Sequence, residues 1–577
     1  MTEGRHPHNR HTVMYGAVIL SAAGIIIKIL GAVFRIPLAN MIGDEGMGYY
    51  SGAYPVYTLL VVIGASGIPI AVSRLVAEHN AEGEPGSANR VFKTALILMA
   101  IVGVCFFCFL YFGSYEITTR LGVLSGAVYG MQAIAPALII VPVMAVMRGY
   151  FQGQQNMKPT AVSQIAEQAF RVVAGLAFAY ILLSEGKAFA AAGGTFGATV
   201  GAAAGLIALL FIYSRKRKSV PYRERREQAR QAREKARHVS TWSIIKRIVI
   251  IAAPITVGAA IMPIMYNIDL WLVPGRLTYA GFDPVTVRSM YGQLSGFAEP
   301  ITNLPKVLTQ AIAISMVPTI VRAWKQKDHE FLSYNVTLGL RFALIIGMPC
   351  TVGLMILSEP IMHLLYPMQL EGAAGAAPAL FIFAIGVVFM SSIDALTSAL
   401  QGVGKQMIPF INIAIGAGCK LAITFVLTGL PFFNIKGAAL GTVSAFVVAA
   451  LLNYRAVQIY TGTRFEPGLT FMRPGFSALV MGGVVAAVYY SLRGAIGESA
   501  VSLAQLAASQ FQRDVTEATL VNALSTLIAI LAGIVVYVIM LFMTRAIKGE
   551  ELKLLPKGES LYKFYRKIVK RRPRKKR

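Results

Sequence analysis

Ten charged side chains lie within stretches of the sequence that are otherwise apolar. A charge at the centre of a lipid bilayer costs about 2.5–3.5 kcal/mol unless it faces water or a partner, so each of the ten is a candidate functional residue. Groups of this kind bind and guide ions or charged substrates. They are Lys28, Arg35, Glu167, Arg171, Asp269, Glu299, Lys306, Arg341, Asp394 and Lys420.

Lys28 and Arg35 form the most informative pair. They are seven residues apart, which places them two turns apart on one face of a helix, and no acidic residue lies within a turn of either. With Arg171 they make the first half of the chain rich in intramembrane bases, which suits an anionic headgroup because arginine binds phosphate oxygens through a planar fork. The sequence therefore predicts a substrate-binding set of Lys28, Arg35, Arg171, Arg341 and Lys420.

Several charges also have simpler interpretations, which the sequence leaves open. Glu167 and Arg171 are four residues apart, so a structural ion pair within one helix explains them equally well. Arg74 and Arg148 fall at predicted cytoplasmic helix ends, where snorkelling to the interface accounts for them. Asp269 falls near the outer end of its span, where its carboxylate can reach water.

The elements that position these residues are predicted to be membrane helices. Hydrophobic residues make up 56% of the chain and charged residues 14%, and apolar runs of about 20 residues, the length that crosses a bilayer core, recur throughout. The first run, residues 14–38, is too long for a signal peptide and is expected to be retained. The chain is predicted to be an all-α polytopic membrane protein.

The sequence predicts fourteen spans. Lys and Arg concentrate in the loops after even-numbered spans and acids in those after odd-numbered spans, which places both termini in the cytoplasm. The eighth span is long and contains Pro300 and Pro305, so it is expected to be bent or to lie partly outside the membrane. The spans cover approximately residues 14–38, 49–73, 91–113, 123–150, 160–184, 188–213, 244–272, 288–322, 334–357, 375–402, 407–429, 435–459, 473–492 and 520–544.

An internal repeat relates two halves of the chain. The segment 148–171 returns about 250 residues later as 398–420, with Gln152-Gly153 matched by Gln401-Gly402. An even number of spans separates the copies, so both halves have the same topology, an organisation common in transporters. We expect a lobe at 1–213, a basic linker at 214–243, a second lobe at 244–459, two further spans within 460–544 and a basic tail at 545–577. The loop residues Gln152, Gly153, Gln401 and Gly402 are predicted hinges.

Most of the +27 net charge lies in two segments. Residues 214–247 carry 13 Lys/Arg against three Glu, and residues 545–577 carry 14 against three. Because both segments flank membrane spans, the positive-inside rule and anionic lipid headgroups explain them, and no nucleic-acid partner is expected. The linker is predicted to be a solvated helix, and the tail a helix on the inner leaflet.

Enzymatic motifs are absent from the sequence. It has no GxxxxGK[ST] phosphate-binding loop, no zinc pattern and no nucleophile elbow. Its four cysteines, Cys105, Cys108, Cys350 and Cys419, lie in spans and are expected to be buried thiols. His6, His8 and His11 are interpreted as a solvated tail. We therefore expect a transporter rather than an enzyme, with no metal site and no cofactor.

Three segments resemble a known family. KILGAVFRIPLANMIGDEGMGYYSGAYPVY, GIPIAVSRLVAE and RGYFQGQQNMKPTAVSQIAEQAFR are similar to the polysaccharide-transport branch of the multidrug/oligosaccharidyl-lipid/polysaccharide exporter superfamily, and within it to stage V sporulation protein B and MurJ-type lipid II flippases. The resemblance covers roughly residues 14–545. It implies two pseudo-symmetric six-helix bundles in a V, two additional helices and alternating access in the plasma membrane.

The resemblance also implies a substrate and a coupling ion. The substrate class is an undecaprenyl-diphosphate sugar, lipid II above all, and the family's cavity arginines correspond by position to Lys28 and Arg35. This sequence has Lys in place of the first Arg and lacks the Arg expected on the second span. Relatives couple to sodium through an acid on the seventh span and polar groups on the eleventh, for which Asp269 and Asn412 are the matches. Asp394 is a further candidate, and protons or the membrane potential are alternatives.

Three other functions remain open at this level. The substrate could be another lipid-linked polysaccharide, including one of the spore cortex or capsule. A drug/cation antiporter of the same superfamily would depend mainly on an isolated acid such as Asp269 or Asp394. A membrane scaffold would recruit cell-wall synthesis proteins through the basic linker and tail, and its intramembrane charges would be dispensable.

Overall fold

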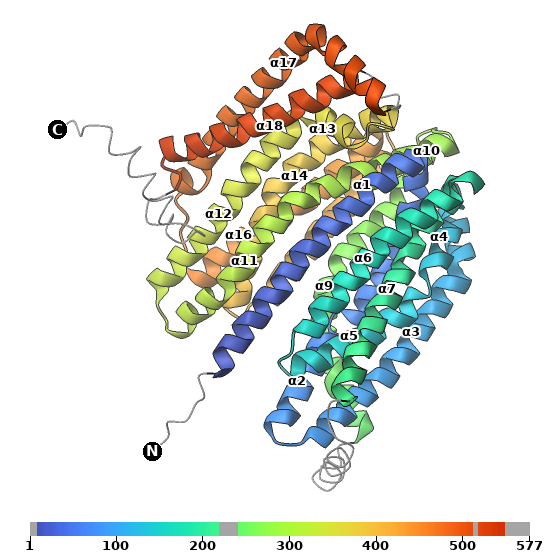
Figure 1. Cartoon of the computed structure of the whole chain (residues 1–577). Helices are drawn as coiled ribbons and strands as arrows, with labels where there is room; N and C mark the ends of the chain where they lie inside the picture. Colours follow the sequence, from blue (N-terminus) through green and yellow to red (C-terminus); the bar gives the residue numbers. More distant parts are fainter. Residues whose placement is uncertain (1–7, 219–239, 512–516, 548–577) are drawn as a thin grey trace, which may run out of the picture. The chain divides into compact units, whose positions relative to one another are not determined.

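The computed structural model describes residues 8–218, 240–511 and 517–547, and every regular element in these ranges is a helix (Figure 1). Thirteen helices are long and apolar enough to cross a membrane. The first of them, Ile26–Ala81, has 56 residues and combines most of the kinked helix α1, His8–Ala65, with the helix α2, Ile68–Ala81, that follows it. At 1.5 Å per residue this is about 84 Å, enough for two crossings of a core of about 30 Å. The all-helical membrane fold is thereby confirmed, and thirteen such helices, the first long enough to cross twice, agree with about fourteen spans.

The first helix contributes to two membrane crossings because it is kinked rather than broken. Helix α1, His8–Ala65, contains Gly43 with φ 72° and ψ −176°. This is a backbone conformation that glycine adopts without the steric penalty other residues meet. Residues before and after Gly43 therefore belong to two successive spans.

The chain forms two compact units, each described separately below. The first extends to Pro300 and also takes in Leu421–Ala438. In it α6 and α7 run side by side (Figure 1). Its other elements after α1 are α2 Ile68–Ala81, α3 Pro85–Leu121, η1 Gly122–Leu124, α4 Ala127–Ile134, α5 Ala137–Gly153, α6 Lys158–Ile181, η2 Leu182–Glu185, α7 Lys187–Lys218, α9 Thr241–Tyr279, α10 Pro284–Gly292 and the π-helix η3 Gln293–Ala298.

The second unit consists of Ile301–Lys420 and the chain from Ala439 onward. Its core joins buried leucines, isoleucines and valines of α11, α12, α14 and α16. Helices α17 and α18 run side by side (Figure 1), and Tyr537 donates to the Ile345 carbonyl at 2.7 Å. The elements are α11 Glu299–Lys325, α12 His329–Ile356, α13 Ser358–Leu365, α14 Leu370–Gly402, α15 Met407–Thr428, α16 Asn434–Thr461, η4 Gly468–Met472, α17 Arg473–Phe511 and α18 Glu517–Met543.

The contact-based units and the predicted lobes are different divisions of the chain. Helices α11, α15 and α16 each pass from one unit to the other, whereas the lobes were assigned from the repeat. The lobe boundaries stay a prediction. The expected linker and tail helices lie mostly in 219–239 and 548–577, outside the described residues.

The predicted eighth span is irregular just before its prolines. Helix α10 continues into the π-helix Gln293–Ala298 and then into α11. Pro300 lacks the N–H that would bond to the carbonyl of Gly296, and its ring crowds that carbonyl, so a regular α-helical turn is disfavoured there. The prolines therefore coincide with a change in helical hydrogen bonding inside one continuous helix, Pro284–Lys325, and the expected bend or partial exit from the membrane stays a prediction.

The two copies of the repeat end their helices in the same turn. After α5 the amide of Asn156 donates to the Phe151 carbonyl at 3.0 Å, and after α14 the amide of Lys405 donates to the Leu400 carbonyl at 2.8 Å. Both pairs are related by the same 249 positions that separate Gly153 from Gly402. The repeat in the sequence is therefore also a repeat of backbone hydrogen bonding.

The glycine of each QG pair fits a close helix contact in its own unit. A Cβ at Gly153 would lie 2.7 Å from the Ser73 carbonyl oxygen of α2, and a Cβ at Gly402 would lie 2.5 Å from Cγ2 of Ile320 in α11. Only glycine allows helices to approach this closely. Gln152 donates to the Thr160 hydroxyl at 3.4 Å, while Gln401 is exposed. Their role as hinges stays a prediction.

Candidate substrate-binding site

Helix α1 carries a ladder of three tyrosines after its kink, which we call the tyrosine ladder. Tyr50, Tyr54 and Tyr57 follow the i, i+4, i+7 spacing of one helix face. The rings of Tyr50 and Tyr54 are stacked with centroids 5.5 Å apart, and those of Tyr54 and Tyr57 are 5.8 Å apart. Tyr50 and Tyr57 are buried, so the ladder is a fixed surface rather than a set of loose side chains.

Two of the predicted arginines contact this ladder. Arg171 of α6 donates a hydrogen bond to the Tyr54 hydroxyl, and its guanidinium carbon lies 5.1 Å from the centroid of that ring. The guanidinium carbon of Arg35 lies 5.9 Å from the centroid of Tyr50. On a straight helix the fifteen residues from 35 to 50 would span about 22 Å, so the kink at Gly43 is what brings Arg35 to the ladder. Both contacts have cation–π geometry.

Arg35 uses only part of its donor capacity in contacts with the protein. Its terminal nitrogen donates to the Ser295 carbonyl in the π-helix at 2.6 Å. Its Nε is buried and has no hydrogen-bond partner among the described residues. A buried guanidinium N–H that is left unsatisfied is costly, and an anionic ligand or an ordered water would relieve this cost.

The structure places Lys28 on the exposed surface of α1, two turns before Arg35. Arg35 and Arg171 are therefore brought to one ladder, while Lys28 lies further along the same helix. Of the three first-half bases in the predicted substrate set, the described structure brings two to a common surface.

One interpretation of the sequence, an ion pair between Glu167 and Arg171, is wrong. The Glu167 carboxylate accepts from Arg148 of α5 at 2.7 Å, and Arg148 Nε also donates to the Ser163 hydroxyl at 3.0 Å. The Arg148 side chain is only 14% exposed. The snorkelling interpretation of Arg148 is therefore wrong, and the acid in this region is engaged by an arginine other than Arg171.

Arg341 and Lys420 are both buried in the second unit, 3% and 1% exposed. Arg341 donates to the carbonyl of Ala546, just beyond the end of α18. The substrate roles predicted for Arg341 and Lys420 stay predictions.

Of the three ion-coupling candidates, Asp269 is buried, and Asn412 and Asp394 make side-chain hydrogen bonds. Asp269 of α9 is 7% exposed, so the interpretation that it simply reaches water is wrong. In the second unit Asn412 donates to the Asn453 side-chain oxygen at 2.8 Å, and Asp394 accepts from the Thr309 hydroxyl at 3.2 Å. Their coupling role stays a prediction.

An ionic cluster at the kink of α1 holds the ladder's helix in place. Glu45 accepts from Arg288 of α10 and from Lys187 of α7, each at 3.1 Å. Asp44 accepts from Gln293 at 2.8 Å. From sequence these two acids were only loop residues between spans, because their partners lie more than 140 positions away.

The tyrosine ladder was also missed from sequence, although MGYYSGAYPVY contains its signal. Intramembrane charges drew attention because they are costly in lipid, whereas tyrosines are common in membrane helices. The spacing of four and then three residues is the helical periodicity that places the three rings on one face.

Comparison with known proteins identifies relatives of similar length. A family model described as polysaccharide biosynthesis protein matches residues 13–324, more than half of the chain. Stage V sporulation protein B of Bacillus subtilis (strain 168) is 28% identical over 551 residues, covering 95% of this chain and 98% of that protein. Lipid II flippase MurJ of the same organism is 27% identical over 467 residues, covering 79% of this chain and 84% of that protein.

Solved structures share the fold at low identity. A lipid II flippase MurJ in an inward closed conformation matches with a TM-score of 0.64 and 16% identity, covering 91% of this chain and 98% of that chain. A multidrug resistance MATE family transporter in an inward-facing conformation matches with a TM-score of 0.63 and 14% identity, covering 78% and 98%. With the resemblance seen in the three motifs thus confirmed, and with a fold shared with MurJ and MATE structures, the chain belongs to the polysaccharide biosynthesis protein family.

Proposed function

We propose that this protein is a flippase that moves an undecaprenyl-diphosphate-linked cell-wall precursor, lipid II in first place, from the inner to the outer leaflet of the plasma membrane. The observation that carries the proposal is the placement of Arg35 and Arg171 on the tyrosine ladder of α1. Two arginines beside phenolic hydroxyls provide what a diphosphate requires: positive charge, forked N–H donors and additional hydroxyl donors.

The diphosphate would bind to donors that the protein does not already use. Each guanidinium has five N–H donors, and Arg35 retains a buried Nε without a protein partner among the described residues. The phenol rings offer flat faces on which a sugar can pack. Lys28, two turns away on α1, would attract the headgroup before it reaches Arg35, and the lipid tail would remain in the bilayer.

Alternating access would move the substrate between the leaflets. The repeat loops at Gln152-Gly153 and Gln401-Gly402 would act as matched bends while the two lobes rock. Coupling to sodium, protons or the membrane potential would use Asp269, with Asn412 and Asp394. Both termini would be cytoplasmic, where the basic linker and tail meet anionic lipid and, in this proposal, cell-wall synthesis proteins.

A second candidate function has the same mechanism but a substrate with a different glycan. Stage V sporulation protein B matches 95% of this chain, whereas lipid II flippase MurJ of Bacillus subtilis matches 79%. The greater coverage by the sporulation protein favours, as the alternative substrate, a lipid-linked polysaccharide made during sporulation. A MATE-type antiporter for cationic drugs is less favoured, because two arginines at the ladder would repel a cation.

Accessibility of the precursor at the cell surface tests the proposal. The protein is depleted in its host, from which related flippases have been removed, and an added enzyme is used to cleave lipid-linked peptidoglycan precursor from outside. Loss of cleavage while total precursor accumulates is the expected result. Unchanged cleavage would contradict lipid II as the substrate, and sensitisation to cationic compounds instead would favour the antiporter.

A further inference from the structure

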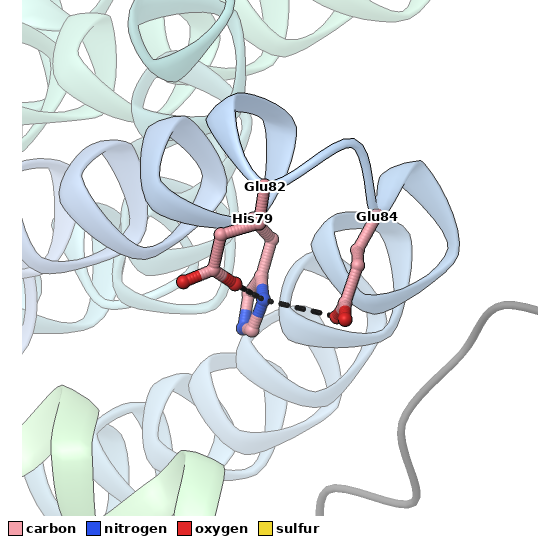
Figure 2. A group of neighbouring side chains, drawn as sticks. All are labelled: His79, Glu82 and Glu84. Carbon is pink, nitrogen blue, oxygen red and sulfur yellow. Dashed lines mark ion pairs between the residues drawn. The ribbon is translucent and has the colours of Figure 1, made fainter.

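The turn between α2 and α3 gathers one histidine and two glutamates. His79 lies in the last turn of α2, Glu82 directly follows this helix, and Glu84 directly precedes α3. Figure 2 shows the three side chains converging from the two helix ends. One ligand atom of each residue lies within 4.8 Å of the other two.

The histidine is buried and its Nδ1 is unsatisfied. His79 is 6% exposed, and its Nδ1 has no hydrogen-bond partner among the described residues. In Figure 2 this nitrogen faces both carboxylates. This nitrogen is within ion-pair distance of both carboxylates but makes no hydrogen bond to either, so a ligand placed between the three groups would satisfy it.

The distances fit a metal ion better than they fit hydrogen bonds. His79 Nδ1 lies 3.4 Å from Glu82 Oε2 and 3.6 Å from Glu84 Oε2. Hydrogen bonds from N–H to oxygen measure about 2.7–3.2 Å. Ligand atoms at about 2.0–2.2 Å from a tetrahedral ion are separated from one another by roughly 3.3–3.6 Å.

Neighbouring groups fix the orientation of the acidic ligands. The Ser87 hydroxyl donates to Glu84 Oε2 at 2.9 Å and so orients that carboxylate, as hydrogen-bond partners of metal ligands do. The Glu84 amide donates to the His79 carbonyl at 2.8 Å, so the turn itself brings these two residues together. Gly83, with φ 74°, occupies the left-handed position of this turn.

We propose that His79 Nδ1, Glu82 and Glu84 bind a divalent first-row transition metal ion of the zinc class. One imidazole and two carboxylates form a mixed nitrogen and oxygen set that suits such an ion, whereas calcium and magnesium prefer oxygen ligands alone. Water would complete the coordination. The ion would tie the end of α2 to the start of α3, beside the contact of Glu78 with Arg247 of α9 at 2.7 Å. The sequence predicted no metal site because spacings of three and five residues across a turn match no common zinc motif.

Metal binding by the full-length protein in detergent tests this site. His6, His8 and His11 are first replaced by Ala and the affinity tag contains no histidine, so that His79 can be assessed without binding by the tail. We expect one zinc ion per chain by competition with a chelating dye, and intense visible absorption when cobalt replaces zinc. His79→Ala should weaken zinc affinity at least about 100-fold, because loss of a ligand costs at least as much as loss of a residue that only orients one.

Two further variants make the result decisive. Glu82→Gln with Glu84→Gln should also weaken binding at least about tenfold while keeping side-chain size, and gel filtration confirms that the fold is intact. His329→Ala is the matched control, because it removes one exposed histidine outside the cluster, and it should bind zinc like the parent. Absence of stoichiometric zinc in the parent would overturn the proposal in favour of a simple pairing of protonated His79 with the two glutamates. Equal affinity of the parent and His79→Ala would also overturn it.

Discussion

The guanidinium of Arg171 donates a hydrogen bond to the hydroxyl of Tyr54 and also lies over the ring of the same tyrosine, 5.1 Å from its centroid. The two residues are 117 positions apart and come from different helices, α6 and α1. The contact holds a permanent positive charge beside the tyrosine ladder at a fixed position.

Substitutions of Arg171 and Tyr54 distinguish the contribution of positive charge from that of hydrogen-bond geometry. Arg171→Lys keeps the charge but loses the fork, and we expect flipping to fall by about tenfold or more. Tyr54→Phe keeps the ring and removes one hydrogen bond of about 1 kcal/mol, so a loss of about fivefold is expected. The measurement is precursor accessibility at the surface of complemented cells. Wild-type flipping by Arg171→Lys would contradict a role in phosphate binding.

Combined loss of Lys28 and Arg35 should abolish function. The double variant Lys28→Ala, Arg35→Ala removes the base that attracts the headgroup and the base that holds it, while insertion into the membrane should be unchanged because hydrophobicity rises. Growth complementation and membrane fractionation measure the two properties. Arg120→Ala is the control, because Arg120 is 70% exposed and, among the described residues, pairs with a glutamate one turn away on its own helix. A double variant that still supports wall synthesis would remove these residues from the site.

The repeated turn predicts opposite effects at two matched positions. Gln155 has φ 59°, and its equivalent Gly404 has φ 78°. The left-handed conformation is costly for a residue with a Cβ, so Gln155→Gly should raise stability by about 0.5–1 kcal/mol. Gly404→Ala should lower stability by about 1 kcal/mol through backbone strain alone, since a Cβ there meets nothing within 4 Å. Thermal unfolding in detergent measures both, and a stabilising Gly404→Ala would refute the argument.

Asp269 and Asp394 should differ in their effect on coupling. Asp269→Asn should reduce the dependence of flipping on a sodium or proton gradient by on the order of tenfold, because a neutral amide binds a cation weakly. Asp394→Asn should have a smaller effect, because an amide oxygen can still accept from Thr309. Flipping in proteoliposomes with and without each gradient gives the comparison. An unchanged gradient dependence in Asp269→Asn would place the coupling site elsewhere.

Hydropathy predicted the all-helical membrane architecture because every span must be apolar by itself to lie in lipid. This required no knowledge of tertiary contacts, and thirteen membrane-length helices among the described residues agree with it. Arg35 and Arg171 were found by the same reasoning, since a charge in an apolar run is conspicuous in any sequence.

Pairing between helices could not be predicted in this way. Glu167 is four residues from Arg171, yet it bonds to Arg148, nineteen positions away, because α5 and α6 face each other after a tight turn. Arg341 likewise donates to the carbonyl of Ala546, 205 positions away, a contact that no spacing in the sequence indicates. Residue spacing identifies neighbours within one helix, whereas residues on different helices become neighbours only after the chain has folded.

The close packing of α6 against α7 has a mechanical consequence. A Cβ at Gly197 would lie 2.6 Å from the Arg171 carbonyl oxygen, and one at Gly193 would lie 2.6 Å from the Phe178 carbonyl carbon. Backbones in such direct contact leave no room for sliding, so the two helices behave as a single stiff lever. A headgroup that binds Arg171 and displaces α6 would therefore also displace Lys187 at the start of α7. This movement would alter the ion pair between Lys187 and Glu45 at the kink of α1.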